Sequence, residues 1–261
     1  LVAYAKDKRF LIVFQKQLLD KIFISSNFNP IIESLASSAE KKHLQVYLAN
    51  PQAFAYLVSQ GLAATMPRQA SSEESGKTTD LLALVEANFG NNWANFYVDR
   101  SIKLETNITE TAEINHKLRI NYINRSLSNQ WPQGKYKNRF KFYLPYGSKL
   151  SKITWGQIDI TSSASSFTDY GRTVYSILLE LEPREQKILM INYSIPQKLD
   201  FQTGTALYRL DIIKQAGTKP DPLEWKLIYP TDFKLQDQKG KEHVILTDLS
   251  KDRGLEVRFI K

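Results

Sequence analysis

Histidine and cysteine, which often perform acid–base, nucleophilic or metal chemistry, are scarce in this 261-residue chain. It has three histidines and no cysteine, which excludes disulfides, thiolate catalysis and zinc held by cysteine. None of His43, His116 and His243 has metal-ligand spacing to a second histidine or a nearby carboxylate. His116 shares a strand face with Ile114 and Leu118, so we expect a histidine buried in a core or interface. The sequence predicts no metal site and no cofactor.

Motifs for nucleophilic or phosphate chemistry are also missing. No Gly-x-Ser-x-Gly elbow occurs, and the Gly-Asn-Asn at 90–92 lacks the further glycines and lysine of a P-loop. Glu180, Glu182 and Glu185 bracket a turn, where we expect solvated carboxylates; a hydrolase would need two of them held roughly 5 to 10 Å apart. A Ser-His-Asp site stays open at this point, because its members converge in space rather than in sequence. We predict no catalytic residue.

The stretch from Trp131 to Lys149 is the strongest candidate for a binding surface. It reads WPQGKYKNRFKFYLPYGSK, and its aromatic and basic residues could stack on sugars or bases while pairing with anionic groups. The predicted glycan or anion contacts are Trp131, Lys135, Tyr136, Lys137, Arg139, Lys141 and Tyr143. The alternative is an ordinary strand with Phe140, Phe142 and Leu144 facing inward and the cations on its outer face or protecting its edge.

The charge of the chain favours an anionic partner. Its formal net charge of +8 and its pI near 9.4 suit nucleic acid, acidic lipid or an acidic glycopolymer. Nucleic acid is the least favoured of these, since no nucleic-acid-binding motif accompanies the charge. The apolar run from Phe10 to Phe14 is too short to span a bilayer, so we expect membrane attachment only through an anchor upstream of Leu1.

The first 90 residues predict the C-terminal part of an α/β domain. Lys8 to Phe23 has apolar residues at spacings of three and four, which indicates a helix. Asn29-Pro30 and Asn50-Pro51 each place a capping side chain before a proline, so each should begin a helix. His43 to Leu48 alternates like a strand, and Leu81 to Ala87 is apolar enough for a strand covered on both faces. Strand, helix and strand in this order predict a crossover unit.

Residues 66–79 interrupt that unit with polar, serine-rich sequence, and we expect a mobile loop there. From Phe96 onward the hydrophobic period changes from 3.6 to 2. The predicted strands are 98–108, 114–122, 139–144, 152–160, 172–181, 186–195, 205–214, 223–229, 243–246 and 255–260. The fold class expected is therefore α+β: a remnant of an α/β domain at 1–90, followed at 91–261 by a mainly antiparallel β-sandwich of the immunoglobulin or fibronectin type. Residues 201–261 either complete this sandwich or form a small extra β unit.

Seven segments together resemble the C-terminal half of the bacterial family called domain of unknown function 4012. They read KHLQVY (42–47), EANFGNNWANFYVDRS (86–101), YINRS (122–126), WPQG (131–134), YLPYGS (143–148), YRL (208–210) and KQAGT (214–218). Their order and approximate spacing also fit, over about residues 41–230. The resemblance implies an extracytoplasmic protein of the bacterial cell surface, anchored in full-length members by an N-terminal membrane segment and associated with cell-surface polysaccharide. It assigns no reaction and no functional residue.

Two functions follow from these expectations. The first is a non-catalytic module of the cell envelope that contacts acidic surface glycopolymers or partner proteins. The alternative is the scaffold half of an enzyme of cell-surface polysaccharide assembly or transfer, with its active site upstream of Leu1. A deep polar pocket near His43, Glu86 and Asn88 with perturbed carboxylates would favour this alternative.

Overall fold

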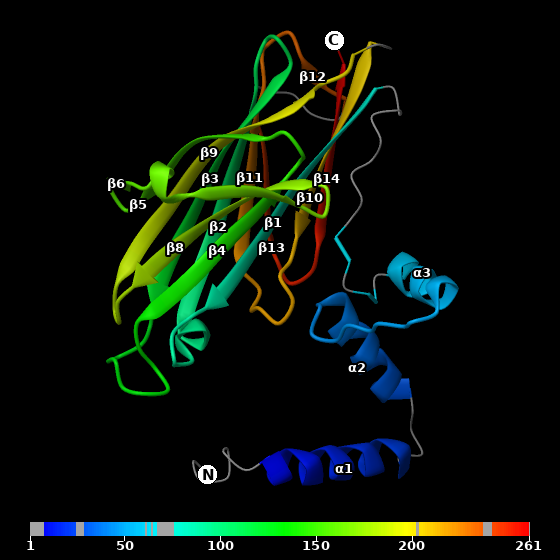
Figure 1. Ribbon diagram of the computed structural model, residues 1–261. Coiled ribbons are helices and arrows are strands. Elements are labelled where there is room, and N and C mark those ends of the chain that lie inside the picture. Colours follow the sequence, from blue (N-terminus) through cyan, green and yellow to red (C-terminus); the bar gives the residue numbers. More distant parts are fainter. Residues whose placement is uncertain are drawn as a thin grey trace. The chain divides into compact units, whose positions relative to one another are not determined.

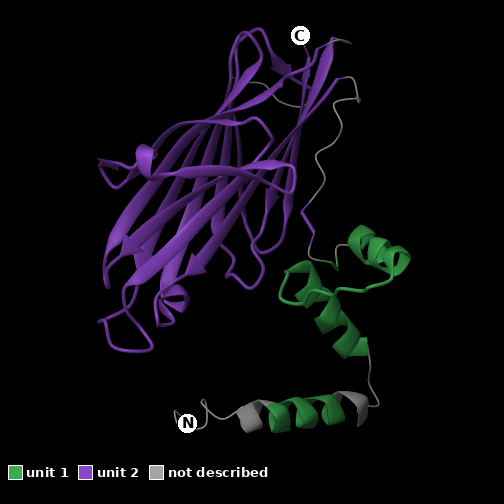
Figure 2. Ribbon diagram, viewed as in Figure 1, with its two compact units in different colours: residues 1–64 green, residues 65–261 purple. Residues whose placement is uncertain are grey.

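The structure is a computed structural model that describes residues 8–24, 29–60, 62–63, 65–66, 76–201, 204–236 and 242–260. The chain divides into two compact units, Leu1–Ala64 and Thr65–Lys261 (Figure 2). Among the described residues, no helix is both long and apolar enough to cross a bilayer.

The first unit contains helices α1 (Lys8–Ile24), α2 (Asn29–Glu40) and α3 (Pro51–Ser59). The predicted start of α3 is confirmed, since Asn50 Oδ1 accepts a hydrogen bond of 3.0 Å from the Ala53 amide. The strand predicted from His43 to Leu48 is wrong, because this segment forms turns and irregular backbone. The described part of this unit contains no strand that could pair with it, so its alternating side chains have no sheet face to bury.

The second unit is a sandwich of two seven-stranded sheets (Figure 1). Sheet A has the order β12-β14-β10-β1-β4-β8-β7, and sheet B has the order β13-β11-β2-β3-β9-β5-β6. The bounds of sheet A are β1 (Lys77–Asn88), β4 (Tyr136–Leu144), β7 (Ser165–Asp169), β8 (Arg172–Leu181), β10 (Thr205–Ile213), β12 (Lys234–Leu235) and β14 (Arg253–Ile260). Those of sheet B are β2 (Val98–Ile108), β3 (Glu113–Asn124), β5 (Lys149–Trp155), β6 (Ile158–Asp159), β9 (Gln186–Lys198), β11 (Pro222–Ile228) and β13 (Glu242–Asp248). Short 3-10 helices lie at Ala94–Phe96 (η2) and Thr161–Ser163 (η3).

The predicted fold class is wrong in its topology. Both sheets are mixed, because β1 pairs in parallel with β10, and β2 pairs in parallel with β11. These pairs join strands more than 100 residues apart, and the remaining pairs are antiparallel. The result is a β-rich unit that is not a clear immunoglobulin-like sandwich. Hydrophobic alternation reports which face of a strand is buried, and it does not report which strand lies beside it.

The α/β remnant is wrong for a related reason. The apolar segment from Leu81 to Ala87 lies within β1 in the middle of sheet A. It is covered on both faces from Leu81 to Leu84, whereas Val85 and Glu86 are half-buried and Ala87 is exposed. Leu82 and Leu84 face the main core, while Leu81 and Ala83 pack on the other face with Tyr143. Side chains of the β-rich unit therefore supply the cover that we expected from helices.

Two further expectations concern segments at the edges of these elements. Within the loop expected at 66–79, Lys77, Thr78 and Thr79 are in β1 and pair with β10, whereas residues 67–75 lie outside the described residues.

The strands after residue 201 complete both sheets, with β10, β12 and β14 in sheet A and β11 and β13 in sheet B. They form no separate β unit.

A buried polar network crosses the core between the sheets. The Asp80 Oδ2 atom lies 2.8 Å from His116 Nε2 and accepts a hydrogen bond of 2.6 Å from the Tyr208 hydroxyl. His116 Nδ1 lies 3.1 Å from Thr106 Oγ1, which accepts a hydrogen bond of 2.9 Å from the Trp225 indole. The prediction of a core histidine at position 116 is confirmed, since this residue is buried on the same face as Ile114 and Leu118.

The pKa of Asp80 shows the electrostatic effect of this network. Burial by itself would raise that pKa, but the charge and hydrogen bond of His116, with hydrogen bonds from Tyr208 and the Leu81 amide, lower it below its usual 3.8. Because the pKa is lower in the folded chain than in the unfolded chain, ionised Asp80 stabilises the fold above about pH 4. This contribution is lost as the pH falls through the folded-state value.

We expect Asp80→Asn to lower the free energy of unfolding at pH 7 by about 2–4 kcal/mol, because it removes the charge from a buried, hydrogen-bonded pair. The difference from the wild type should begin to shrink below about pH 4, where Asp80 of the unfolded chain takes up a proton, and should disappear as the pH falls through the lower pKa of Asp80 in the folded chain. Urea unfolding at pH 7 and at pH 3, followed by tryptophan fluorescence, measures both values. The exposed Asp232→Asn is the control, and an equal loss at both pH values would contradict the assignment.

Candidate functional site: a basic stripe, an aromatic platform and an end pocket

The structure divides the predicted binding stretch between the two faces of β4. The side chains of Lys137, Arg139 and Lys141 lie on the outer face of sheet A; we call these three residues the basic stripe. The Arg139 guanidinium lies 5.6 Å from the centre of the Phe89 ring, and Lys141 Nζ lies 5.5 Å from that of Phe167. Among the described residues, no carboxylate forms an ion pair with any of the three cations.

Three other residues of the predicted site are engaged within the protein. Lys135 Nζ pairs with Glu180 at 2.5 Å and Glu182 at 2.8 Å. Tyr136 is buried and turns inward, where its hydroxyl donates a hydrogen bond of 3.0 Å to Glu86. Tyr143 is also buried, within the small apolar cluster on the outer face of β1 and β4, and its hydroxyl donates to Asp169. The structure therefore does not bring these three residues to an open surface with the basic stripe.

Trp131 belongs to a different surface. Its ring centre lies 5.5 Å from that of Trp93, which in turn lies 6.2 Å from that of Phe96. All three side chains are more than half exposed, at 55%, 53% and 63%. We call Trp93, Phe96 and Trp131 the aromatic platform. Exposed aromatic rings gathered in this way are typical of interaction surfaces.

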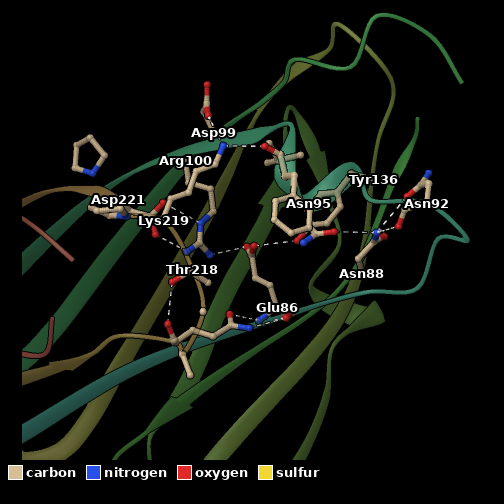
Figure 3. A pocket seen from close by; sticks show the side chains of 17 residues that line it. Glu86, Asn88, Asn92, Asn95, Asp99, Arg100, Tyr136, Thr218, Lys219 and Asp221 are labelled. Carbon is tan, nitrogen blue, oxygen red and sulfur yellow. Dashed lines mark hydrogen bonds and ion pairs between the residues drawn. The ribbon is translucent and has the colours of Figure 1, made fainter. Parts of the chain in front are cut away.

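A pocket of about 660 Å³ opens beside the platform, with Phe96 in its wall. We call it the end pocket (Figure 3). Its volume lies within the roughly 300–1,000 Å³ range of small-molecule sites. The end of β1, the start of β2, Tyr136 of β4 and the β10–β11 connection surround it. The lining residues are Glu86, Asn88, Asn92, Asn95, Phe96, Val98, Asp99, Arg100, Tyr136, Gln215, Ala216, Gly217, Thr218, Lys219, Pro220, Asp221 and Pro222.

An ion network forms the floor of the end pocket. Figure 3 shows the Glu86 carboxylate between Arg100 and Tyr136. Arg100 Nη1 lies 3.0 Å from Glu86 Oε1, and the other side of the guanidinium donates through Nε and Nη2 to both carboxylate oxygens of Asp221. The Tyr122 and Tyr136 hydroxyls donate to the two oxygens of Glu86, at 2.5 and 3.0 Å. Glu86 thus accepts two hydrogen bonds and forms one ion pair.

The pKa shifts follow from this arrangement. Burial by itself would lower the pKa of Arg100, but Glu86 and Asp221 raise it well above its usual value. Burial raises the pKa of Tyr122 and Tyr136, and the Glu86 charge adds to the effect, so both phenols stay protonated and donate. Burial also raises the pKa of Asp221, and the attraction of Arg100 only partly offsets it.

A ring of amides and a second ion pair form the walls. Asn88 Nδ2 donates to the backbone carbonyl of Asn92 at 2.9 Å and to the Asn95 Oδ1 at 3.4 Å. Gln215 exchanges two hydrogen bonds of 2.8 Å with the backbone of Glu86, which fixes the β10–β11 connection against β1. Lys219 Nζ donates to the Phe96 carbonyl at 2.8 Å and lies 3.5 Å from Asp99.

This chemistry favours binding over acid–base catalysis. The end pocket contains a carboxylate with a perturbed pKa, Asp221, as the enzyme alternative requires. Both of its oxygens face Arg100, however, and Glu86 accepts hydrogen bonds from two tyrosines and pairs with Arg100, so neither carboxylate is placed as a free base. His116 lies in the core network, His43 belongs to the first unit, and no cluster of metal-ligating side chains occurs among the described residues.

Sequence reasoning missed Arg100, Asp221 and Lys219. A signal was present for Arg100, since it is in phase with the buried Val98 and Ile102 and is therefore an inward charge that needs partners. No local signal marks Asp221, because it lies 121 residues from Arg100 in sequence. Most of the lining residues come from two segments that carry the family resemblance, 86–101 and 214–218.

Comparisons with known proteins give distant similarities. No protein-family model matches the chain, and neither does any curated protein sequence. A putative nutrient binding protein from Legionella pneumophila is 8% identical, with a TM-score of 0.44 over 70% of this chain and 71% of that one. An M1 zinc metallopeptidase from Deinococcus radiodurans is 9% identical (TM-score 0.34), over 62% of this chain and 42% of its own. Yeast leukotriene A4 hydrolase is 7% identical (TM-score 0.34), over 74% and 31%. TM-scores this low carry no argument about function.

We expect Arg100→Met to lower the free energy of unfolding by about 3–5 kcal/mol, because it leaves two buried carboxylates without their cation. The control is Lys103→Met on the same strand. Its ion pair with Glu224 is largely exposed, so the loss should be below about 1 kcal/mol. Urea unfolding measures both. The triple variant Glu86→Gln/Arg100→Met/Asp221→Asn should recover much of the free energy of unfolding that Arg100→Met loses. Equal losses in Arg100→Met and Lys103→Met would contradict this role for Arg100.

Proposed function

We propose that the β-rich unit is a non-catalytic binding module of the bacterial cell surface, and that its basic stripe holds an acidic glycopolymer. The observation that carries this proposal is the row of Lys137, Arg139 and Lys141 on one strand face, which lacks ion-pair partners among the described residues. The resemblance of seven segments to an envelope family supports the location and the class of polymer. In the full-length protein, an N-terminal anchor would hold the module outside the membrane.

The geometry of the stripe suits a repeating polyanion. Alternate residues of a strand point to the same face about 6.6–6.8 Å apart, so the three cations form a line of regularly spaced charges. The rings of Phe89 and Phe167 lie against Arg139 and Lys141, which limits the conformations of both side chains. Charges held in place lose less conformational entropy when an anionic chain binds.

An acidic glycopolymer fits this surface better than nucleic acid does. Proteins that bind single strands place open aromatic faces along a basic groove, so that bases can stack on them. Beside the basic stripe, one face of the Phe89 ring is instead covered by Arg139, and one face of the Phe167 ring by Lys141. A line of carboxylate or phosphate groups along a glycan needs the cations and no base stacking.

A second candidate function is the scaffold of a polysaccharide-assembly enzyme whose catalytic half lies upstream. The raised pKa of Asp221 in the end pocket is the observation that favours it. The pairing of this carboxylate with Arg100 makes the binding module our first choice.

We expect Lys137→Glu/Arg139→Glu/Lys141→Glu to weaken binding to purified anionic cell-wall glycopolymer by roughly tenfold or more, since three attractive contacts become repulsive. Co-sedimentation across a salt series measures this. Wild-type binding should fall steeply as salt rises, because screening weakens contacts between exposed charges.

The matched control is Lys103→Glu/Lys117→Glu/Arg119→Glu, which makes the same change in net charge with exposed residues on the outer face of sheet B. It should bind the polymer at least several-fold more tightly than the stripe variant. Equal weakening by both variants would show an effect of overall charge alone. Absence of wild-type binding at low salt would also refute the proposal.

A further inference from the structure

The end pocket and the aromatic platform form one continuous surface that the basic stripe does not explain. Phe96 belongs to both, because it lines the pocket and its ring lies beside Trp93. Trp93 then contacts Trp131, so exposed rings continue outward from the pocket. The backbone amide of Trp93 donates to the Pro132 carbonyl at 2.7 Å, which connects the two loops that carry the platform.

We propose that the end pocket is a second binding site, which takes a neutral saccharide unit, and that the aromatic platform holds the following sugar rings of the same chain. The proposal goes beyond the basic stripe and does not depend on it. It rests on the charge balance of the pocket, on its amides and on the position of the rings.

The charged groups of the end pocket are paired with one another. Arg100 is held between Glu86 and Asp221, and Lys219 lies between Asp99 and the Phe96 carbonyl (Figure 3). Asp99 also pairs with Arg125 at 3.0 Å. An ionic ligand would have to displace one of these partners. Breaking the Arg100 pairs is costly because they are buried, whereas the pairs of Asp99 with Lys219 and Arg125 are about half exposed and cost less to break. The pocket therefore favours a ligand without a net charge.

The amide and carboxylate groups of the end pocket can form hydrogen bonds with the hydroxyl groups of a ligand. Asn95 is exposed on the pocket wall, and its Nδ2 donates to no other described residue. Amides both donate and accept, and paired carboxylates keep lone pairs that can accept further hydrogen bonds. A sugar hydroxyl also donates and accepts, so it can use both kinds of group without a change in protonation.

The aromatic rings supply the apolar part of sugar recognition. One face of a pyranose ring presents C–H groups, which pack on the face of an aromatic side chain. The Phe96 ring offers such a surface at the pocket, and Trp93 and Trp131 repeat it along the platform. A longer neutral oligosaccharide should therefore bind more tightly than a single sugar, because it contacts both parts.

The test is binding of uncharged saccharides to the full chain. We would use glucose, cellobiose and cellotetraose, with N-acetylglucosamine, chitobiose and chitotetraose as a second series, and measure saturation-transfer NMR and calorimetric affinities. We expect binding that increases with chain length in at least one series. Glucuronate and glucosamine are the charged probes, and they should bind more weakly than glucose.

Variants locate the site. Phe96→Ala should weaken the binding of every saccharide in the active series by roughly fivefold or more, as expected for the loss of an aromatic contact. Ala216→Trp should block the pocket, and Trp93→Ala should remove the advantage of the longer chains while the monosaccharide still binds. Tyr170→Ala removes an aromatic side chain that is 76% exposed and lies outside both surfaces, and it should bind like the wild type.

Salt separates this proposal from that of the basic stripe. Neutral saccharides should bind equally at about 50 and 500 mM salt, whereas binding of the acidic polymer should not. Saccharide binding that falls with salt would overturn the inference, as would absence of binding in both series, or Phe96→Ala and Ala216→Trp binding like the wild type. None of these results would bear on the polymer assay, so the two proposals fail separately.

Discussion

The Arg100 guanidinium joins the two sheets at one end of the sandwich. It projects from β2 of sheet B and meets Glu86 of sheet A on one side and Asp221, just before β11, on the other. A buried cation must be paired, and Arg100 compensates the charge of both buried carboxylates. The position of β1 against β2 and the course of the β10–β11 connection are therefore coupled at this one group.

The end pocket exists because of that coupling. The connection between β10 and β11 is fixed by the pairing of Asp221 with Arg100 and by the hydrogen bonds of Gln215 to the backbone of Glu86. The hydrogen bond from Asn88 to the Asn92 carbonyl stabilises the turn after β1. The space left between these two loops is lined with groups whose charges are already compensated. The same interactions that stabilise the end of the sandwich thus determine that the pocket is polar without being strongly charged.

Strand β4 shows how one stretch of sequence can serve several surfaces. Its inward residues Tyr136, Phe140 and Phe142 belong to the core, and its outward residues Lys137, Arg139 and Lys141 form the basic stripe. The sequence suggested a single mixed site of aromatic and basic residues. The pleat of the strand separates them, because successive side chains point to opposite faces.

The sequence by itself determined the local features: the strand periods, the cap at Asn50, the burial of His116 and the two-sided cover of β1 from Leu81 to Leu84. Each depends on residues within a few positions of one another, whose spacing dictates which face is buried. The partners of each strand were decided only by the tertiary structure. The parallel pairs β1·β10 and β2·β11 join segments over 100 residues apart, and their register brings Arg100 to Asp221. Local periodicity carries no information on such pairings, which is why the α/β remnant was predicted in error and the end pocket was found only in the folded chain.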